Sequence, residues 1–270
     1  MIIKGGIYLV MGLLDTDSIA YAIGRALESF GARVLYTAQN ERMKDLFLNR
    51  GGRLTDAELA AMDIRFCDVT VEEELTALFK GLPGPLAGVV HSIAYANPRT
   101  CLGEEFHTAA LADLTQAFHI SCVSLASVAR HAVPRMSGGG ALVALSFDTT
   151  RVYPYYNWMG VNKAALEALV RALARRHGRD GVRVNAVSAG PLYSKAASRI
   201  PGFGKLDQLW KTSSPLQWDP HGDKQEVAHA VTFLLGPYAQ KITGQILCVD
   251  GGASIVAGEL MDFERPPALT

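Results

Sequence analysis

Two side chains in the middle of the chain have types and spacing suited to redox chemistry. Tyr156 precedes Lys163 by seven residues, and seven helical steps of about 100° make nearly two full turns. On a regular helix both side chains would therefore share one face. A phenol can donate a hydrogen bond to an oxygen on which negative charge develops, and an ammonium can hold a ribose hydroxyl and favour the same charge. The pair predicts a site that stabilises an anionic intermediate beside a nucleotide.

The same residues also have a purely structural interpretation. Aromatic side chains at the start of a buried helix usually pack in the core, and Tyr153, Tyr155 and Tyr156 cluster here. The three tyrosines cannot all be catalytic, so at least one is expected to pack. A lysine is usually solvated. The spacing alone leaves both interpretations open.

The elements around this pair alternate between strands and helices. Apolar runs predict strands at 7–10, 33–37, 64–67, 87–91, 141–146, 182–187 and 245–249. Most of these runs are continuous, which is typical of parallel strands covered on both faces. Helices are predicted at 18–30, 71–80, 109–135, 155–177 and 225–235. We therefore expect one α/β domain over residues 1–270, a Rossmann-type doubly wound fold with a seven-stranded parallel sheet flanked by helices.

Composition and charge restrict the class of function. The 270 residues are 49% hydrophobic, and 26 basic residues balance 26 acidic ones, so no basic stripe for nucleic acid is expected. No apolar run approaches the ~18 residues of a membrane span. The first strand follows the N-terminus too closely for a signal peptide, so we expect no membrane partner and a cytoplasmic location. Widely spaced cysteines predict free buried thiols and no metal site: Cys67, Cys101, Cys122 and Cys248.

The segment after the first strand is a candidate phosphate-binding loop. In a doubly wound sheet the ligand lies beyond the carboxyl ends of the strands. Gly12 permits a tight turn there, and Ser18 can cap a helix whose N-terminus faces a pyrophosphate. The loop lacks the second and third glycines of a GxGxxG fingerprint, so an ordinary strand-to-helix loop is the alternative.

Residues after the second and third strands are candidates for binding the adenosine half of a dinucleotide. Gln39 can hydrogen-bond a ribose hydroxyl, and Glu41 would repel a 2′-phosphate, although Arg42 would attract one. NADH is therefore favoured over NADPH. Asp68 offers a carboxylate to the adenine amino group and Val69 an apolar wall to its ring. An ordinary residue at the start of a helix is the alternative for Asp68.

Longer segments resemble one family. Residues 156–168, with the sequence YNWMGVNKAALEA, resemble bacterial NADH-dependent enoyl-[acyl-carrier-protein] reductases of the short-chain dehydrogenase/reductase superfamily. Other short-chain dehydrogenases place the tyrosine four residues before the lysine, where this chain has Met159. The resemblance runs from about Gly5 to Leu260 and includes segments 18–21, 36–40, 91–93, 181–191 and 249–252.

The resemblance implies a role for each matching residue. Tyr156 would bind the substrate and stabilise the enolate formed when hydride from NADH reaches C3 of a trans-2-enoyl thioester, and Lys163 would hold the nicotinamide ribose. Ala96 would meet the substrate. The family also implies a substrate carried by acyl carrier protein, and a homotetramer. The positions expected to contact NAD are Gly12, Ser18, Ile19, Gln39, Asp68, Val69, Ile93, Lys163, Leu192 and Ser194.

Two substitutions depart from the usual family pattern. Phe147 stands at the catalytic site where tyrosine is frequent, so it can gate or pack against the substrate but cannot donate a proton. Ala94 adds a methyl group where glycine is usual. Another short-chain reductase, or a non-catalytic NADH-binding paralogue, is therefore an alternative, and these two residues are the support for the paralogue.

Residues 194–215 resemble the substrate-binding loop of the family. Glycine and proline residues in this stretch suit a mobile lid. Leu206, Leu209 and Trp210 recur at helical spacing, which predicts a lid helix rather than an acyl tunnel. A plain surface loop is the alternative.

Overall fold

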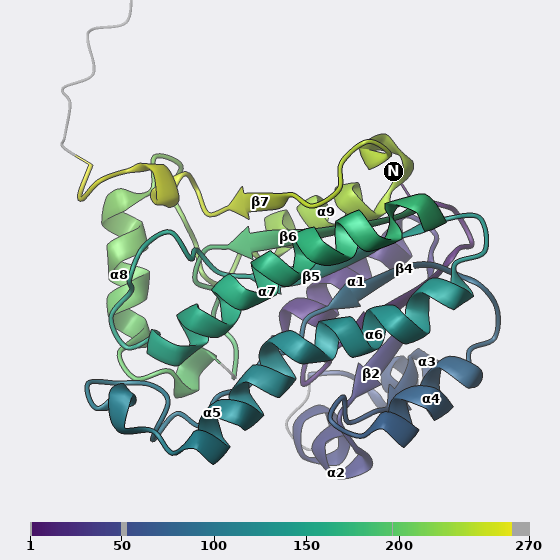
Figure 1. The fold of residues 1–270 in the computed structure, drawn as a ribbon, viewed down its shortest axis with the longest axis horizontal. Coiled ribbons are helices and arrows are strands. Elements are labelled where there is room, and N and C mark those ends of the chain that lie inside the picture. The colour runs from purple at the N-terminus through teal and green to yellow at the C-terminus, as the bar shows by residue number, and fades with distance from the viewer. Residues whose placement is uncertain (1, 50–52, 196, 261–270) are drawn as a thin grey trace, which may run out of the picture.

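The computed structural model describes residues 2–49, 53–195 and 197–260. Its strands form one seven-stranded, wholly parallel sheet of order β3-β2-β1-β4-β5-β6-β7. The strand order switches between β1 and β4, and all carboxyl ends lie at one edge (Figure 1), which confirms the predicted doubly wound fold. The strands are β1 (Ile7–Met11), β2 (Arg33–Ala38), β3 (Asp63–Phe66), β4 (Leu86–His91), β5 (Gly140–Ser146), β6 (Val182–Ala189) and β7 (Ile246–Val249).

Helices cover both faces of the sheet. The longer ones are α1 (Ile19–Ser29), α4 (Glu72–Lys80), α5 (Leu111–Phe118), α6 (Ser124–Ala132), α7 (Asn157–His177), α8 (Phe203–Ser213) and α9 (Lys224–Leu235). Figure 1 shows α6 and α7 in front of the sheet and α1 and α9 behind it. Along β1, Tyr8 and Val10 join the core under α1 and α9, whereas Leu9 and Met11 join the core under α4, α6 and α7. This period-two alternation buries the strand on both faces, as its continuous apolar sequence predicts.

The helix predicted over 109–135 is divided. A π-helical segment, His119–Val123, separates α5 from α6. The Ser121 hydroxyl accepts a hydrogen bond from the Tyr95 amide and donates one to the Tyr95 carbonyl, and the Ser124 hydroxyl lies 2.8 Å from Nε2 of His91. These bonds tie the helix to the end of β4 and the loop after it, and π segments are common where a helix meets such a constraint.

The helix predicted over 155–177 begins two residues later, at Asn157. Tyr155 and Asn157 have φ angles of 64° and 34°, and Tyr156 between them occupies the N-cap position. The assumption of a regular helix running through Tyr156 is therefore wrong. The side chain of Tyr156 is directed by the irregular turn that precedes α7, and not by helical periodicity.

Two short helices between β2 and β3 were not predicted. They are α2 (Glu41–Lys44), continued by a π segment (Asp45–Asn49), and α3 (Asp56–Ala61). Asn40 caps the amide of Met43 in α2, and Thr55 and Glu58 form a reciprocal capping box for α3. Both caps are local sequence signals of a helix start.

The cysteines are free, as predicted, but their burial differs. Cys67, Cys101 and Cys122 are buried, whereas Cys248 is exposed. The prediction of buried thiols is wrong for Cys248 because it lies on β7, the edge strand of the sheet, whose two central residues are exposed.

One helical stretch, Leu111–Arg135, is long and apolar enough to cross a membrane, with a mean hydropathy of 1.2 and 33% of its most apolar window buried. The expectation that no run approaches this length was wrong by this measure. Length and hydropathy alone do not identify a span, because a helix packed against other protein has the same composition.

Candidate active site

The loop after β1 depends on one glycine. Gly12 has a φ angle of 96°, and a Cβ atom there would lie 2.1 Å from the carbonyl oxygen of Ser92. The amides of Gly12 and Leu13 both donate to the carbonyl of Thr37, at 3.2 and 2.8 Å. The ends of β1 and β2 and the residue after β4 therefore meet here, and no other residue type fits without displacing the backbone. This close packing leaves the backbone of the loop exposed to a ligand without an intervening side chain, as the predicted phosphate-binding role requires.

The N-terminus of α1 opens at the other end of this loop. The Ser18 hydroxyl accepts a hydrogen bond from the Tyr21 amide at 3.3 Å and donates one to the Asp15 carbonyl at 2.6 Å. Ile19, half-buried, is the first residue of α1. The unsatisfied amides and the helix dipole at such an end attract anions. The predicted phosphate-binding residues Gly12, Ser18 and Ile19 thus belong to one continuous structure.

The two polar residues predicted for the adenosine half bond each other. Nε2 of Gln39, just after β2, donates to Oδ2 of Asp68, after β3, at 2.8 Å. Partial burial raises the pKa of Asp68, but hydrogen bonds from Thr70 and Gln39 outweigh it and hold the pKa below its usual value. Asp68 also accepts from the Thr70 amide, which stabilises the turn before α4, but the helix itself begins at Glu72, with the preceding residue as its N-cap. The contact of Asp68 with adenine stays a prediction. Val69 next to it is buried.

Lys163 is a buried cation in the second turn of α7. It is 5% exposed, and its Nζ donates to the carbonyl of Leu145 in β5 at 2.7 Å. Burial lowers the pKa of Lys163 to about 8, while Cys122 and Glu167 act in the opposite direction. Burial, followed by the nearby charge of Lys163, lowers the pKa of His91 to about 3, so that imidazole is neutral. Of these two buried bases, Lys163 therefore carries the positive charge at neutral pH, and His91 carries none.

Glu167 lies one turn beyond Lys163 and was not predicted as a site residue. Its two carboxylate oxygens accept hydrogen bonds from the Ser146 and Thr149 hydroxyls, both at 2.7 Å. The residue is 8% exposed. A buried carboxylate with both oxygens bonded, four residues from a buried lysine, balances part of its charge. The spacing of Lys163 and Glu167 was the sequence signal that could have identified it.

Tyr156 meets the same end of β5 as Lys163. Its ring centre lies 4.7 Å from that of Phe147, two residues beyond Leu145. The side chain is 8% exposed, and burial raises the pKa of its phenol, which is therefore protonated. Within the described ranges no group hydrogen-bonds this hydroxyl, so it can donate to a ligand. The structure thus brings Tyr156, Lys163 and Phe147 to one strand end despite the irregular start of α7.

Phe147 lies at the centre of an aromatic cluster that joins the site to the 194–215 segment. Its ring centre is 5.2 Å from that of Tyr153 and 5.4 Å from that of Trp210. Trp210 belongs to α8 and is 1% exposed, and Leu206 on the same helix is buried. A helix is therefore present where the lid helix is predicted, and it packs on Phe147. Its role as a lid stays a prediction. Leu209 does not take part, because it lies on the outer face of α8 and is 36% exposed.

The remaining predicted residues also follow strand ends. Ile93, half-buried, lies beside Gly12, where its Cγ1 would be 3.2 Å from an added Cβ atom. Ala96 and Leu192 are buried, and the Ser194 hydroxyl accepts from the amide of Ala197 at 3.1 Å. Their contacts with a cofactor or substrate stay predictions. Residues that the sequence analysis missed and the structure adds to this region are Asp15, Asp148, Glu167 and Lys195.

Comparison with known proteins gives one consistent result. The profile of the family described as Enoyl-(Acyl carrier protein) reductase matches residues 12–254. The enoyl-[acyl-carrier-protein] reductase [NADH] FabI of Bacillus cereus is 36% identical over 94% of this chain and 99% of its own length. The enoyl-[acyl-carrier-protein] reductase [NADH] of Mycolicibacterium smegmatis is 34% identical over 94% and 97%.

A solved structure agrees with these relatives. The crystal structure of the Bacillus cereus enoyl-acyl carrier protein reductase with NADP+ and indole naphthyridinone matches with a TM-score of 0.83 and 34% identity, over 95% of this chain and 99% of that one. The matched residues, 12–254 in the family profile and 95% of this chain in the solved structure, span the strand ends described above. The chain belongs to the enoyl-(acyl carrier protein) reductase family.

Proposed function

We propose that this protein is an NADH-dependent enoyl-[acyl-carrier-protein] reductase that reduces the double bond of a trans-2-enoyl thioester. The observation that carries the proposal is the meeting of a protonated, unbonded phenol and a buried ammonium at the end of β5, on Phe147 and Leu145. Family membership supports the same reaction. We treat residues 1–270 as a single reductase domain with a lid at about 194–215.

The residues at the sheet edge fit a dinucleotide. The loop at Gly12, the amides at the start of α1 and the Gln39–Asp68 pair lie where a doubly wound sheet binds pyrophosphate and ribose. Asp68, and Glu41 two residues beyond Gln39, would repel a 2′-phosphate, although Arg42 would attract one, so NADH is favoured over NADPH. The relatives are named for NADH, although the Bacillus cereus structure contains NADP+. When bound, NADH supplies the hydride.

The chain's own residues would stabilise the enolate of the substrate. Hydride arriving at C3 places negative charge on the thioester oxygen as an enolate, and a proton added at C2 then completes the saturated thioester. The Tyr156 hydroxyl donates a hydrogen bond to that oxygen, and the Lys163 ammonium holds the nicotinamide ribose and favours the charge. Phe147, without a hydroxyl, is buried against Tyr156 and Trp210 and would exclude water from the site and pack against the acyl chain.

We also propose a homotetramer. Apolar side chains are exposed on α5, where Leu111 is 78% exposed and Phe118 43%, and on α7, where Val161 is 53% exposed. Such a surface over adjoining helices is typical of a subunit interface. The four free cysteines fit a reducing cytoplasm. Sedimentation of the wild-type protein would measure the assembly, and a monomer at micromolar concentration would contradict it.

A steady-state assay tests the activity. Crotonyl-acyl carrier protein and NADH should give oxidation of NADH with one equivalent of saturated thioester, and NADPH should be the poorer donor. Oxidation of NADH only with ketones would favour another short-chain reductase. Binding of NADH without turnover of any enoyl thioester would favour a non-catalytic paralogue.

A further inference from the structure

The loop that precedes α1 carries two carboxylates, Asp15 and Asp17, at the place where the proposed function puts the cofactor's pyrophosphate. Asp15 is 3% exposed. Its Oδ1 accepts from the Asp17 amide, but its Oδ2 has no hydrogen-bond partner within the described part of the chain. A buried carboxylate beside a phosphate site repels the ligand unless a cation offsets it.

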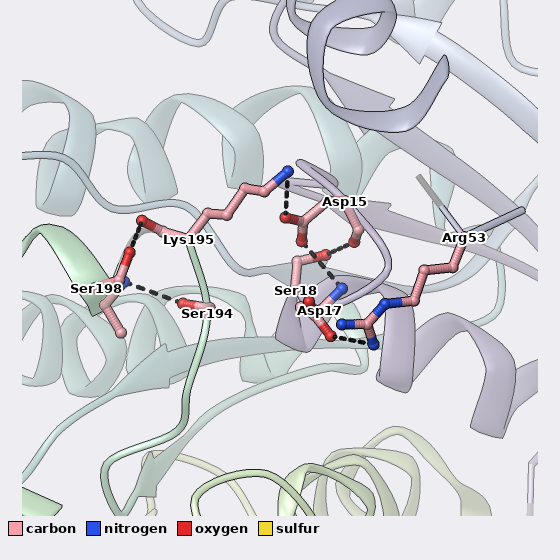
Figure 2. A network of polar contacts seen from close by, with 8 residues as sticks. Asp15, Asp17, Ser18, Arg53, Ser194, Lys195 and Ser198 are labelled. Atoms are coloured by element: carbon pink, nitrogen blue, oxygen red, sulfur yellow. Dashed lines mark hydrogen bonds and ion pairs between the residues drawn. The ribbon is translucent and has the colours of Figure 1, made fainter. Parts of the chain in front are cut away.

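Lys195 supplies that cation from a distant part of the chain. Its Nζ lies 3.5 Å from Oδ2 of Asp15 and 4.9 Å from the centre of the Phe47 ring. Figure 2 shows the side chain extending from the segment after Ser194 to the loop before Ser18. The ammonium is thus held by a carboxylate on one side and an aromatic face on another, next to the α1 N-terminus.

Asp17 offers an internal comparison. It pairs with Arg53 at 3.3 Å, but the Arg53 side chain is 78% exposed, against 40% for Lys195 and 4% for Asp15. An ion pair so exposed contributes little stabilisation, because solvent screens the attraction between its charges. Burial lowers the pKa of Lys224, at the start of α9, and the charges of Asp17 and Asp15 act against this shift, but Lys224 forms no ion pair with either carboxylate among the residues described. Lys195 is therefore the cation in direct contact with the Asp15 carboxylate.

We propose that Lys195 is a cofactor-binding residue whose ammonium, held in place by Asp15, binds the pyrophosphate of the dinucleotide. This proposal rests on the proposed function, since it assumes that NADH binds at the α1 N-terminus. An ammonium has three donors, so it can contact a carboxylate and a phosphate oxygen together. Asp15 positions the ammonium before the ligand arrives, which reduces the entropy lost on binding. The cation also joins the start of the lid segment to the nucleotide loop.

Binding measurements with the full chain test the proposal. Lys195→Met keeps an apolar stem over Phe47 but removes the charge, and it should weaken NADH binding about tenfold, the loss typical of one charged hydrogen bond. The affinity for ADP-ribose, which has the pyrophosphate but no nicotinamide, should fall by the same factor in Lys195→Met. The matched control Arg53→Met should change neither affinity by more than about twofold. Lys195→Arg should retain most of the binding.

Further readouts separate this role from a merely structural one. Lys195→Met should raise the KM for NADH without changing the KM for the enoyl thioester, and should make NADH affinity less sensitive to salt. In an Asp15→Asn background, Lys195→Met should reduce the affinity for NADH by a smaller factor. The repulsion between the Asp15 carboxylate and the pyrophosphate, which Lys195 offsets, is already absent there.

The outcomes are distinguishable. If the wild-type protein and Arg53→Met bind NADH while Lys195→Met binds within about twofold of them, the proposal is overturned and the proposed function stands. Equal salt dependence of NADH binding in Lys195→Met and wild type also contradicts it. If the wild-type protein binds neither NADH nor ADP-ribose, both the proposed function and this proposal fail.

Discussion

At the proposed nucleotide end of the site, Gln39 is exposed and shares one hydrogen bond with a half-buried Asp68, whereas at the proposed catalytic end Tyr156 and Lys163 are 8% and 5% exposed. Burial raises the pKa of Tyr156 and lowers that of Lys163, so both groups are tuned by their surroundings. The exposed pair is screened by solvent and can be replaced by water. We therefore expect single substitutions to have large effects at the end of β5 and small ones at the ends of β2 and β3.

The largest effect should come from Lys163→Met, which removes the buried cation but keeps an apolar stem. We expect kcat/KM to fall about 10³-fold, because both ribose binding and stabilisation of the enolate lose their charge. Circular dichroism should show an unchanged fold. A loss of less than tenfold in kcat/KM would place the chemistry elsewhere.

Tyr156→Phe should follow, with kcat reduced about 10²-fold and a much smaller change in the KM for the enoyl thioester, since the lost hydrogen bond strengthens as the enolate forms. Tyr153→Phe is the matched control. The Tyr153 hydroxyl donates to Asp148 and is therefore occupied, so kcat should change little. Equal losses in the two variants would remove the distinction between the catalytic and the packing tyrosine.

Gly12→Ala tests the one nucleotide-end position at which the structure permits no side chain. An alanine would adopt a strained φ of 96° with its Cβ against the Ser92 carbonyl, and we expect unfolding to become easier by about 2–3 kcal/mol. Gly204→Ala, where nothing lies within 4 Å of an added Cβ atom, is the control and should be neutral. Thermal unfolding of both variants measures the difference, and equal midpoints would contradict it.

The pH dependence of kcat/KM reports on the charge of Lys163. Its pKa is lowered to about 8, so the ammonium is present below pH 8 and is lost as the pH rises through this value. We expect kcat/KM to be constant from pH 6 to about 7.5 and then to fall about tenfold per pH unit above 8. A profile that stays flat to pH 10 would show that the free enzyme keeps an ordinary lysine pKa.

The smallest effect should come from Gln39→Ala, which removes one exposed hydrogen bond. We expect the KM for NADH to rise by only about two- to fivefold, with kcat unchanged. A loss as large as that of Tyr156→Phe would show that the two ends of the site do not differ as their burial suggests.

The residues that sequence reasoning found are those with local signals. Tyr156 and Lys163 were identified by their spacing, and Gly12 and Ser18 by their position after a strand. The capping box of Thr55 and Glu58 at the start of α3 is an equally local signal, from which that helix can be predicted. The start of α7 could not be predicted, because the backbone of Tyr155 and Asn157 is held in an unusual conformation by contacts such as that of Gly103 with Asn157.

The sequence by itself determined the doubly wound parallel sheet, because continuous apolar strands between amphipathic helices can bury both faces in few other ways. Only the tertiary structure decided which polar groups meet. Asp15 and Lys195 are far apart in the chain, and β1 and β6 are not neighbours in the sheet, so their pairing depends on how the segment after β6 runs along the carboxyl edge of the sheet. Burial likewise decided the protonation of Tyr156 and Lys163, since desolvation depends on the whole packed surroundings and not on neighbours in sequence.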